Sequence, residues 1–207
     1  ALVPMIRNRE FDKVRNGFVH VLGISKISDF FMLSFLQKMV NKYHGGRIQV
    51  STDSSSPGLY PVYGTYLHSP QLSKMTFTDL YFPKGEDLPY NATDLVPNPL
   101  GHPVSEGFTF GDVSTYKGDV TMKMTLNNLF VFNDTVKQVE EIVKCHNELL
   151  KTVIPRDFYS VLMSMEEMFK DPDKAIHIYN KNRQLYDRFG GSTRDLVNNE
   201  VFNQFFE

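Results

Sequence analysis

The sequence predicts an α/β fold built on parallel strands, and three observations support this class. A short apolar run is followed by a strand, a helix and another strand within the first quarter of the chain. The connections between these segments are short, which indicates a parallel crossover in an α/β sheet or barrel. Only about three strands are visible, whereas a closed barrel needs about eight. We therefore expect the chain to form the last part of a larger α/β domain.

The predicted strands lie in residues 1–56. Residues 1–6, ALVPMI, suit a short buried strand, and residues 17–25, GFVHVLGIS, form a second run that is almost continuously apolar. Such runs are typical of parallel strands that are covered on both faces. Residues 47–52, RIQVST, alternate in polarity and predict a third strand.

A helix is predicted between the second and third strands. Ser28 and Asp29 can cap its start, and apolar residues then recur at helical spacing as far as Val40. The HGG of residues 44–46 predicts its end, because glycine commonly follows the last turn of a helix.

The remainder divides into two regions. Residues 57–123 are rich in proline, glycine and aromatic residues, which predicts a long irregular insertion with a small hairpin that includes residues 74–82. Residues 124–207 show helical periodicity again and are expected to cover the sheet or barrel. The predicted helices span residues 126–151, 156–169 and 175–189, with a last one in the tail at 195–207.

Composition narrows the class of protein only slightly. The net charge of −2 gives no global basic field of the kind that dominates non-specific nucleic-acid binding. No apolar stretch reaches the length of a membrane helix, and residues 1–10 do not resemble a signal peptide, so no membrane partner is expected. The single cysteine, Cys145, excludes an internal disulfide and suits a reducing compartment, so we expect a cytoplasmic protein.

The candidate site lies where the second and third strands end, because α/β folds build their sites at the carboxyl ends of strands. Asp53 follows the third strand, while Gly23 and Ser25 follow the second. Two interpretations of Asp53 are open: a carboxylate displayed for chemistry, or a turn-former that bonds its own backbone. His20 is interpreted as a core histidine.

Three segments in this order resemble tRNA-guanine transglycosylases. GFVHVLGIS followed by IQVSTDSSS is similar to that family's strand with a Leu/Met-Gly pair and the next strand with the catalytic aspartate. Further along, MTLNNLFVFNDTVKQVEEIVK resembles a late family helix, with Leu126, Asn128 and Leu129 on matching positions. The aspartate followed by serines is most similar to the DpdA-like phage and bacterial members, which insert 7-deazaguanines into DNA.

The resemblance implies the C-terminal part of a (β/α)8 TIM-type barrel whose N-terminal half lies elsewhere, in the same chain or on a partner. It implies that Asp53 is the nucleophile that exchanges guanine in nucleic acid, DNA rather than tRNA, for a 7-deazaguanine. Substrate-binding roles fall to residues around it, namely Leu22, Gly23, Ser25, Ser54 and Ser55. A phage-encoded enzyme of this kind would act in the host cytoplasm.

The sequence departs from the family in its metal ligands and in the segment after the aspartate, among other places. Its zinc site uses three cysteines and a histidine, and Cys145 alone cannot provide that set, so neither a metal nor another cofactor is expected. SSSPGLYPVYG replaces the family's Pro-Thr-Arg-Asn segment, which disfavours tRNA as the substrate. Two alternatives therefore stay open: an inactive nucleic-acid-binding or structural subunit derived from a barrel, and a hydrolase that cleaves the glycosidic bond with water.

Overall fold

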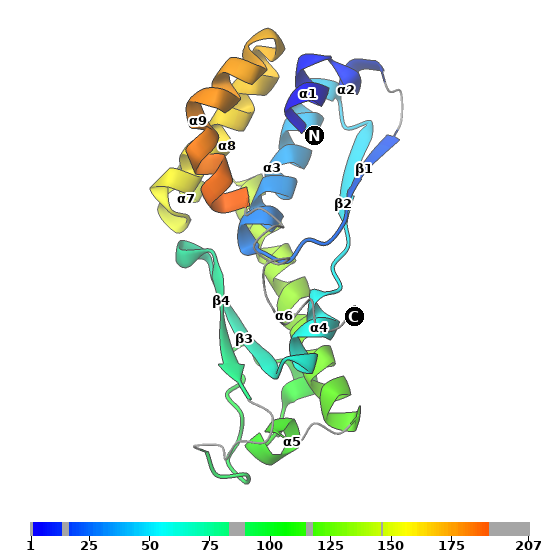
Figure 1. Cartoon of the computed structure of the whole chain (residues 1–207), viewed down its shortest axis with the longest axis vertical. Helices are drawn as coiled ribbons and strands as arrows, with labels where there is room; N and C mark the ends of the chain where they lie inside the picture. Colours follow the sequence, from blue (N-terminus) through cyan, green and yellow to red (C-terminus); the bar gives the residue numbers. More distant parts are fainter. Residues whose placement is uncertain (1, 14–16, 83–89, 115–117, 146, 191–207) are drawn as a thin grey trace, which may run out of the picture.

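The computed structural model describes residues 2–13, 17–82, 90–114, 118–145 and 147–190, and every structural statement below concerns these residues. The helices are α1 (Leu2–Arg7), α2 (Glu10–Lys13), α3 (Ile27–His44), α4 (Ser56–Val62), α5 (Phe110–Ser114), α6 (Gly118–Lys144), α7 (Asn147–Val153), α8 (Arg156–Lys170) and α9 (Ala175–Gly190). The strands are β1 (Gly17–Val21), β2 (Ile48–Thr52), β3 (Thr65–Gln71) and β4 (Thr76–Tyr81). Figure 1 shows an elongated molecule in which α6 links a helix-rich end to an end formed around α5.

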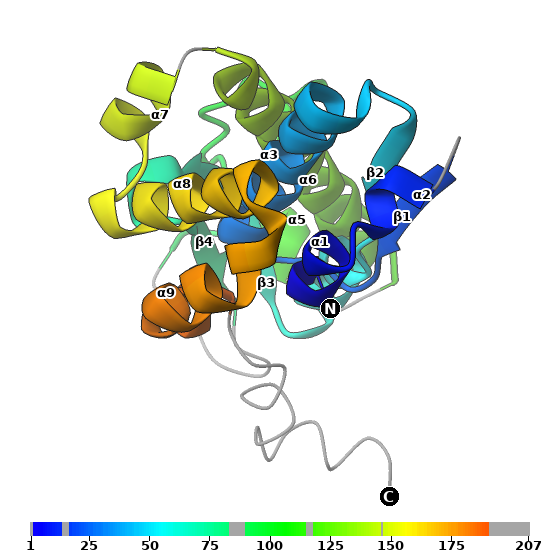
Figure 2. The same ribbon diagram turned by 90° about the horizontal axis from the view of Figure 1, so that it is seen from above.

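The predicted strand–helix–strand unit is confirmed. β1 and β2 pair in parallel with Val19 opposite Val50, and α3 connects them. α3 buries an apolar stripe, and it ends at Gly45 with φ of 70°, a left-handed conformation that glycine adopts without strain. Seen from above, α3 lies between the β1–β2 pair and the α8–α9 pair (Figure 2).

The prediction of a (β/α)8 barrel portion is wrong. The described strands form two separate two-stranded sheets, β1–β2 and β3–β4, and most of the described chain is helical. Residues 2–7 form helix α1 instead of a strand; Pro4 is tolerated there because it lies in the first turn, where its missing N–H has no partner to lose. β1 also exposes alternate residues, Phe18 and His20, whereas a barrel strand is covered on both faces.

The predicted insertion contains the expected hairpin. β3 and β4 pair antiparallel, with Thr65 opposite Tyr81 and a register shift between Leu67 and Ser69. The free edge of β3 is held by amides of α6. Asn128 accepts from the Leu67 N–H at 2.8 Å and donates to the Thr65 carbonyl at 3.0 Å, and Asn127 donates to the Leu67 carbonyl at 2.7 Å.

The C-terminal helices are confirmed as α8 and α9, while the single helix predicted over residues 126–151 is wrong in detail. α6 begins earlier, at Gly118, and ends at Lys144 before α7 begins. Lys38 from α3 donates to the carbonyls of Val143 (2.6 Å) and Cys145 (3.0 Å), and a cation at this position satisfies the last carbonyls of a helix. The helix predicted at 195–207 lies outside the described residues.

Two apolar clusters stabilise the chain. The larger cluster joins α3, α6, α8 and the short helices α1 and α2, with Phe31, Phe35 and Phe158 fully buried. The smaller one lies around α5 and includes Phe82 and Phe110. None of the helices in the described part of the chain is both long and apolar enough to cross a membrane.

Candidate functional site

Asp53 lies directly after β2, beside the chain segment that leaves β1. Its Oδ1 atom accepts a hydrogen bond of 3.1 Å from the Gly23 backbone N–H, which belongs to the other strand's exit. Backbone bonds hold the two exits together, because the Asp53 N–H donates to Val21 and the Asp53 carbonyl accepts from Ile24. The carboxylate therefore bonds across the strand pair, and its side chain is 60% exposed.

His20 adjoins this carboxylate, and Ser51 adjoins His20. They are register partners in the β1–β2 pair, and His20 Nδ1 lies 2.9 Å from Ser51 Oγ. His20 Nε2 lies 3.8 Å from Asp53 Oδ2, too far for a hydrogen bond but close enough for an ion pair when the imidazole is protonated. The interpretation of His20 as a core histidine is wrong, since its side chain is 38% exposed.

Neither His20 nor Ser51 was predicted as part of the site. The signal was present in the period-two alternation of strands, which puts His20 on the same face as Phe18 and Ser51 on the same face as Asp53. The almost continuous apolar run had indicated a strand covered on both faces, and this concealed the alternation.

The other predicted site residues have different surroundings. Gly23 adopts φ of 73° and donates its N–H to Asp53, and Leu22 is 70% exposed. The Ser54 hydroxyl accepts from the Ser56 N–H at 3.2 Å, and Ser55 occupies the position before α4. The structure thus brings Leu22 and Gly23 to Asp53, whereas the hydrogen bond recorded for Ser54 serves the start of α4.

Ser25 is engaged by a neighbouring tyrosine. Burial raises the pKa of the Tyr60 phenol, and the nearby charge of Asp79 adds to this, against the opposite effect of a hydrogen bond with Ser25. Tyr60 also packs near Phe132, and Tyr66 is buried. These two tyrosines therefore cover the core.

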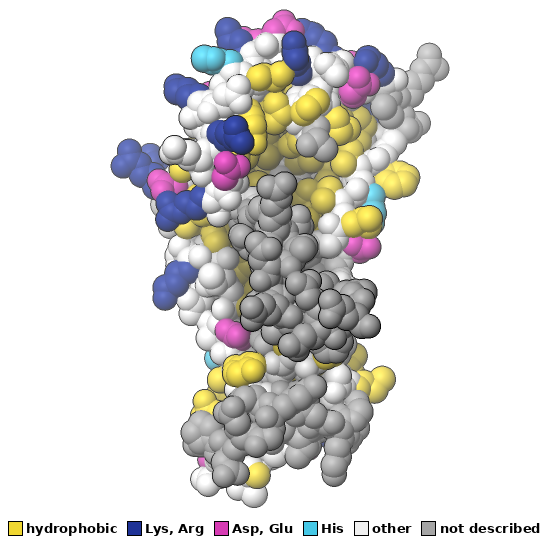
Figure 3. All heavy atoms as spheres, in the orientation of Figure 1, with side chains coloured by type: hydrophobic (Ala, Val, Ile, Leu, Met, Phe, Trp, Pro, Cys, Tyr) yellow, Lys and Arg dark blue, Asp and Glu magenta, His cyan; other side chains and the backbone are white. Residues whose placement is uncertain are grey.

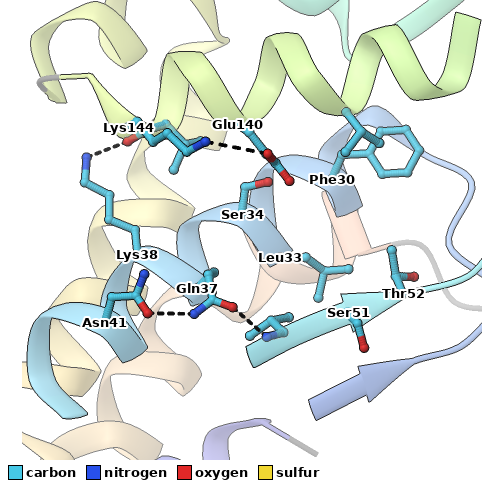
Figure 4. Close-up of a pocket in the computed structure, with 13 residues that line it drawn as sticks. Phe30, Leu33, Ser34, Gln37, Lys38, Asn41, Ser51, Thr52, Glu140 and Lys144 are labelled. Atoms are coloured by element: carbon cyan, nitrogen blue, oxygen red, sulfur yellow. Dashed lines mark hydrogen bonds and ion pairs between the residues drawn. The ribbon is translucent and has the colours of Figure 1, made fainter. Parts of the chain in front are cut away.

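A groove runs along the other edge of β2, away from β1 (Figure 4). Its volume is about 410 Å³, and α3, β2 and α6 line it. Gln37 extends from α3 to this edge, donating to the Ile48 carbonyl at 3.0 Å and accepting from the Val50 N–H at 2.6 Å. An amide in this position occupies hydrogen-bonding groups that another strand would use, so it protects the edge from pairing.

A second, largely apolar hollow of about 500 Å³ lies between α1, β1, α3, α8 and α9. Figure 3 shows it as a depressed hydrophobic area toward the helix-rich end. Asp29 is one of its few polar linings; burial raises the pKa of its carboxyl, partly offset by a hydrogen bond from the Lys26 backbone. That bond gives Asp29 a structural role at the start of α3.

Across the described ranges, no three His, Cys, Asp or Glu side chains converge in a way that could hold a metal ion. The chemistry available around Asp53 therefore comes from a carboxylate, an imidazole, a hydroxyl and a backbone N–H.

The fold and site define a helix-rich chain that displays a carboxylate at the ends of two parallel strands. Comparison with protein-family models, curated proteins and solved structures gives no significant match. The resemblance to transglycosylases accordingly rests on the order of the sequence motifs alone.

Proposed function

We propose that the chain is a base-exchange glycosyltransferase that replaces guanine in nucleic acid, with DNA favoured over tRNA, by a 7-deazaguanine. One observation supports this most directly. The Asp53 carboxylate lies at the carboxyl ends of β1 and β2, with Oδ1 oriented by the Gly23 N–H and Oδ2 beside His20. An oriented, accessible carboxylate is the group that a covalent glycosyl intermediate requires.

In the first half of the proposed reaction, Asp53 Oδ2 attacks C1′ of the target nucleotide. The bond between C1′ and N9 of guanine breaks, and its electron pair stays with the base, which takes a proton from the His20 imidazolium. The target nucleotide must be turned out of its stack for this attack. Leu22 and Gly23 adjoin the position of the leaving base.

In the second half, a 7-deazaguanine attacks C1′ through N9 and the Asp53 carboxylate is released. The proton lost from N9 returns to His20, so charge and atoms balance over the cycle. No cofactor is needed, because the aspartyl ester retains the activated sugar. The lone cysteine, Cys145, suits a reducing compartment, and we place the reaction in the cytoplasm.

Incorporation of labelled guanine tests the proposal. The chain is incubated with labelled guanine and either DNA or tRNA, and label in the polymer is counted. We expect incorporation into DNA that Asp53→Asn abolishes and that the control Asp173→Asn, at another exposed carboxylate, leaves unchanged. Incorporation that survives in Asp53→Asn would remove Asp53 from the role of nucleophile.

A second candidate is a nucleic-acid-binding subunit without catalysis. It is favoured by the open surroundings of Asp53, whose carboxylate is mostly exposed next to an exposed Leu22. This candidate predicts oligonucleotide binding that Asp53→Asn leaves unchanged, together with no incorporation of guanine by the unmodified chain. Release of free guanine without incorporation would instead indicate a hydrolase.

A further inference from the structure

One face of the β1–β2 pair carries large apolar side chains that the core does not use. Alternation along the two strands puts three residues of each on this face. The paired positions are Phe18 with Gln49 and His20 with Ser51, followed by Leu22 next to Asp53. We call these six residues the platform. Phe18 is 74% exposed and Leu22 is 70% exposed, and Figure 3 shows hydrophobic side chains standing out where these strands lie.

The opposite face of the same strands already supplies the packing that folding needs. Val19 and Val50 pack against the larger apolar cluster through α3. Phe18 points away from that cluster, and leaving an aromatic ring in water is unfavourable. A single exposed apolar residue is common, but here two of them flank His20 on the face that bears the candidate nucleophile.

The chemistry of the platform matches the bases of an unpaired strand. An exposed aromatic ring stacks on any base, and the amide of Gln49 offers a donor and an acceptor beside it. At about 3.3 Å per residue, Phe18 lies roughly 13 Å along the strand from Leu22. A short run of nucleotides in one strand can span that distance. The ring can reach base faces only where the bases are not paired inside a duplex.

A cation lies at one end of the platform. Arg47 directly precedes β2, falls on the same face as Gln49 and Ser51 by alternation, and is exposed. It can contact a phosphate beside the bound bases, although the net charge of the chain is negative.

We propose that the platform binds an unpaired stretch of nucleic acid, with the target nucleotide at Asp53 and another base of the same strand stacked on Phe18. This inference rests on the proposed function and gives that function its substrate class: single-stranded or locally unpaired nucleic acid rather than a closed duplex.

Fluorescence anisotropy with a labelled 12-nucleotide single strand, and with the same sequence as a duplex, tests this at fixed salt. We expect tighter binding of the single strand. Phe18→Ala should weaken the affinity for the single strand about tenfold, which is the order expected for the loss of one base–aromatic stack. Phe18→Tyr keeps an aromatic ring and should bind the single strand as the unmodified chain does. Tyr81→Ala is the matched control, since Tyr81 is an exposed aromatic residue on the other sheet.

Two results would overturn the proposed role of the platform. One is that Phe18→Ala binds the single strand as tightly as the unmodified chain does; the other is that the unmodified chain binds the single strand and the duplex equally. Self-association in sedimentation that Phe18→Ala abolishes would overturn that role too, because the platform would then serve a second copy of the chain. Circular dichroism shows whether each variant is folded.

The same variants separate this inference from the proposed function. Phe18-dependent binding without any guanine incorporation would leave the platform standing and reject base exchange. Incorporation that Phe18→Ala does not reduce would reject the platform and keep base exchange.

Discussion

Asp53 is positioned by a backbone group rather than by the serines that follow it. The Gly23 N–H holds Oδ1, and Gly23 itself adopts a left-handed conformation. A Cβ atom added at residue 23 would meet no heavy atom within 4 Å, so the penalty of substitution by alanine comes from the backbone conformation itself.

Substitution of Gly23 measures this penalty. We expect Gly23→Ala to lower the free energy of unfolding by about 1–2 kcal/mol, because alanine is strained at φ of 73°. Gly23→Asn should lower it by less, since asparagine tolerates this conformation better. Urea unfolding of both variants measures the difference, and equal losses would mean that the conformation at residue 23 does not matter.

Glu166 provides a pH-dependent contribution to stability. Burial alone would raise the pKa of its carboxyl, but Lys42 at 2.7 Å and Lys170 at 3.4 Å outweigh this and lower the pKa. A carboxyl whose pKa is lower in the folded state stabilises the fold above its unfolded pKa of about 4.3 and loses that contribution as the pH falls.

Between pH 5 and pH 3 we therefore expect the free energy of unfolding to fall by about 1 kcal/mol more in the unmodified chain than in Glu166→Gln. This value is kept small because Lys42 is half exposed, and solvent screens its interaction with Glu166. The control is Asp187→Asn, whose ion pair with Arg183 is exposed on both sides and should change the pH dependence little. If the free energy of unfolding changed with pH in the same way in Glu166→Gln and in the unmodified chain, Glu166 would not provide this pH-dependent contribution. Urea unfolding at each pH gives the free energies.

At the scale of elements, side-chain amides occupy strand edges in both sheets. Gln37 from α3 does so on β2, and Asn127 and Asn128 from α6 do so on β3. Asn128 is fully buried, so its match to a motif of the transglycosylase-like helix has a structural explanation in this chain. Among the described residues, no further strand pairs with these edges. The amides instead attach the β1–β2 pair and the β3–β4 hairpin to helices.

Asn128→Leu tests this attachment. The variant keeps the approximate shape but leaves the Leu67 N–H and the Thr65 carbonyl without their partner, so we expect a loss of about 2–4 kcal/mol. Gln49→Leu, at an exposed amide on β2, should change stability by less than about 0.5 kcal/mol. Chemical denaturation of the two variants gives the comparison, and similar losses would show that burial of the amide is unimportant.

The sequence predicted the elements whose signals are local. Helix α3 was predicted from the helical spacing before Val40 and the stop at Gly45. Helices α8 and α9 were predicted from their periodicity. The barrel was predicted wrongly, because an apolar run does not reveal which of its faces is covered. Phe18 and Leu22 count as apolar in the sequence, yet both lie in solvent.

The candidate site was predictable only in part. Asp53 and Gly23 followed from the rule that sites lie at strand ends, and the structure joins them by a hydrogen bond. The contact between His20 and Ser51 depends on the register of β1 against β2, which a single sequence does not specify.

At the scale of the whole molecule, the two apolar clusters differ greatly in size. The cluster around α3 draws on most of the helices, whereas the one around Phe82 and Phe110 is confined to the end near α5. Local opening requires less free energy where fewer apolar contacts are broken. Asp53 lies nearer the larger cluster, because it follows β2, which packs on α3.

Hydrogen exchange tests this difference. We expect the amide of Phe110, which bonds the Asp94 carbonyl at 2.9 Å, to exchange faster than the amide of Phe35 in the middle of α3. Mass spectrometry of the exchanging peptides follows both. Equal protection would indicate that the two clusters unfold as a single unit.

The most direct test of the central claim is a search for the covalent intermediate. The chain is mixed with a guanine-containing single strand in the absence of 7-deazaguanine, denatured, and examined by mass spectrometry of its peptides. We expect a nucleic-acid adduct on Asp53 that is absent from Asp53→Asn. An adduct on another residue, or one that persists in Asp53→Asn, would contradict the assignment of Asp53 as the nucleophile.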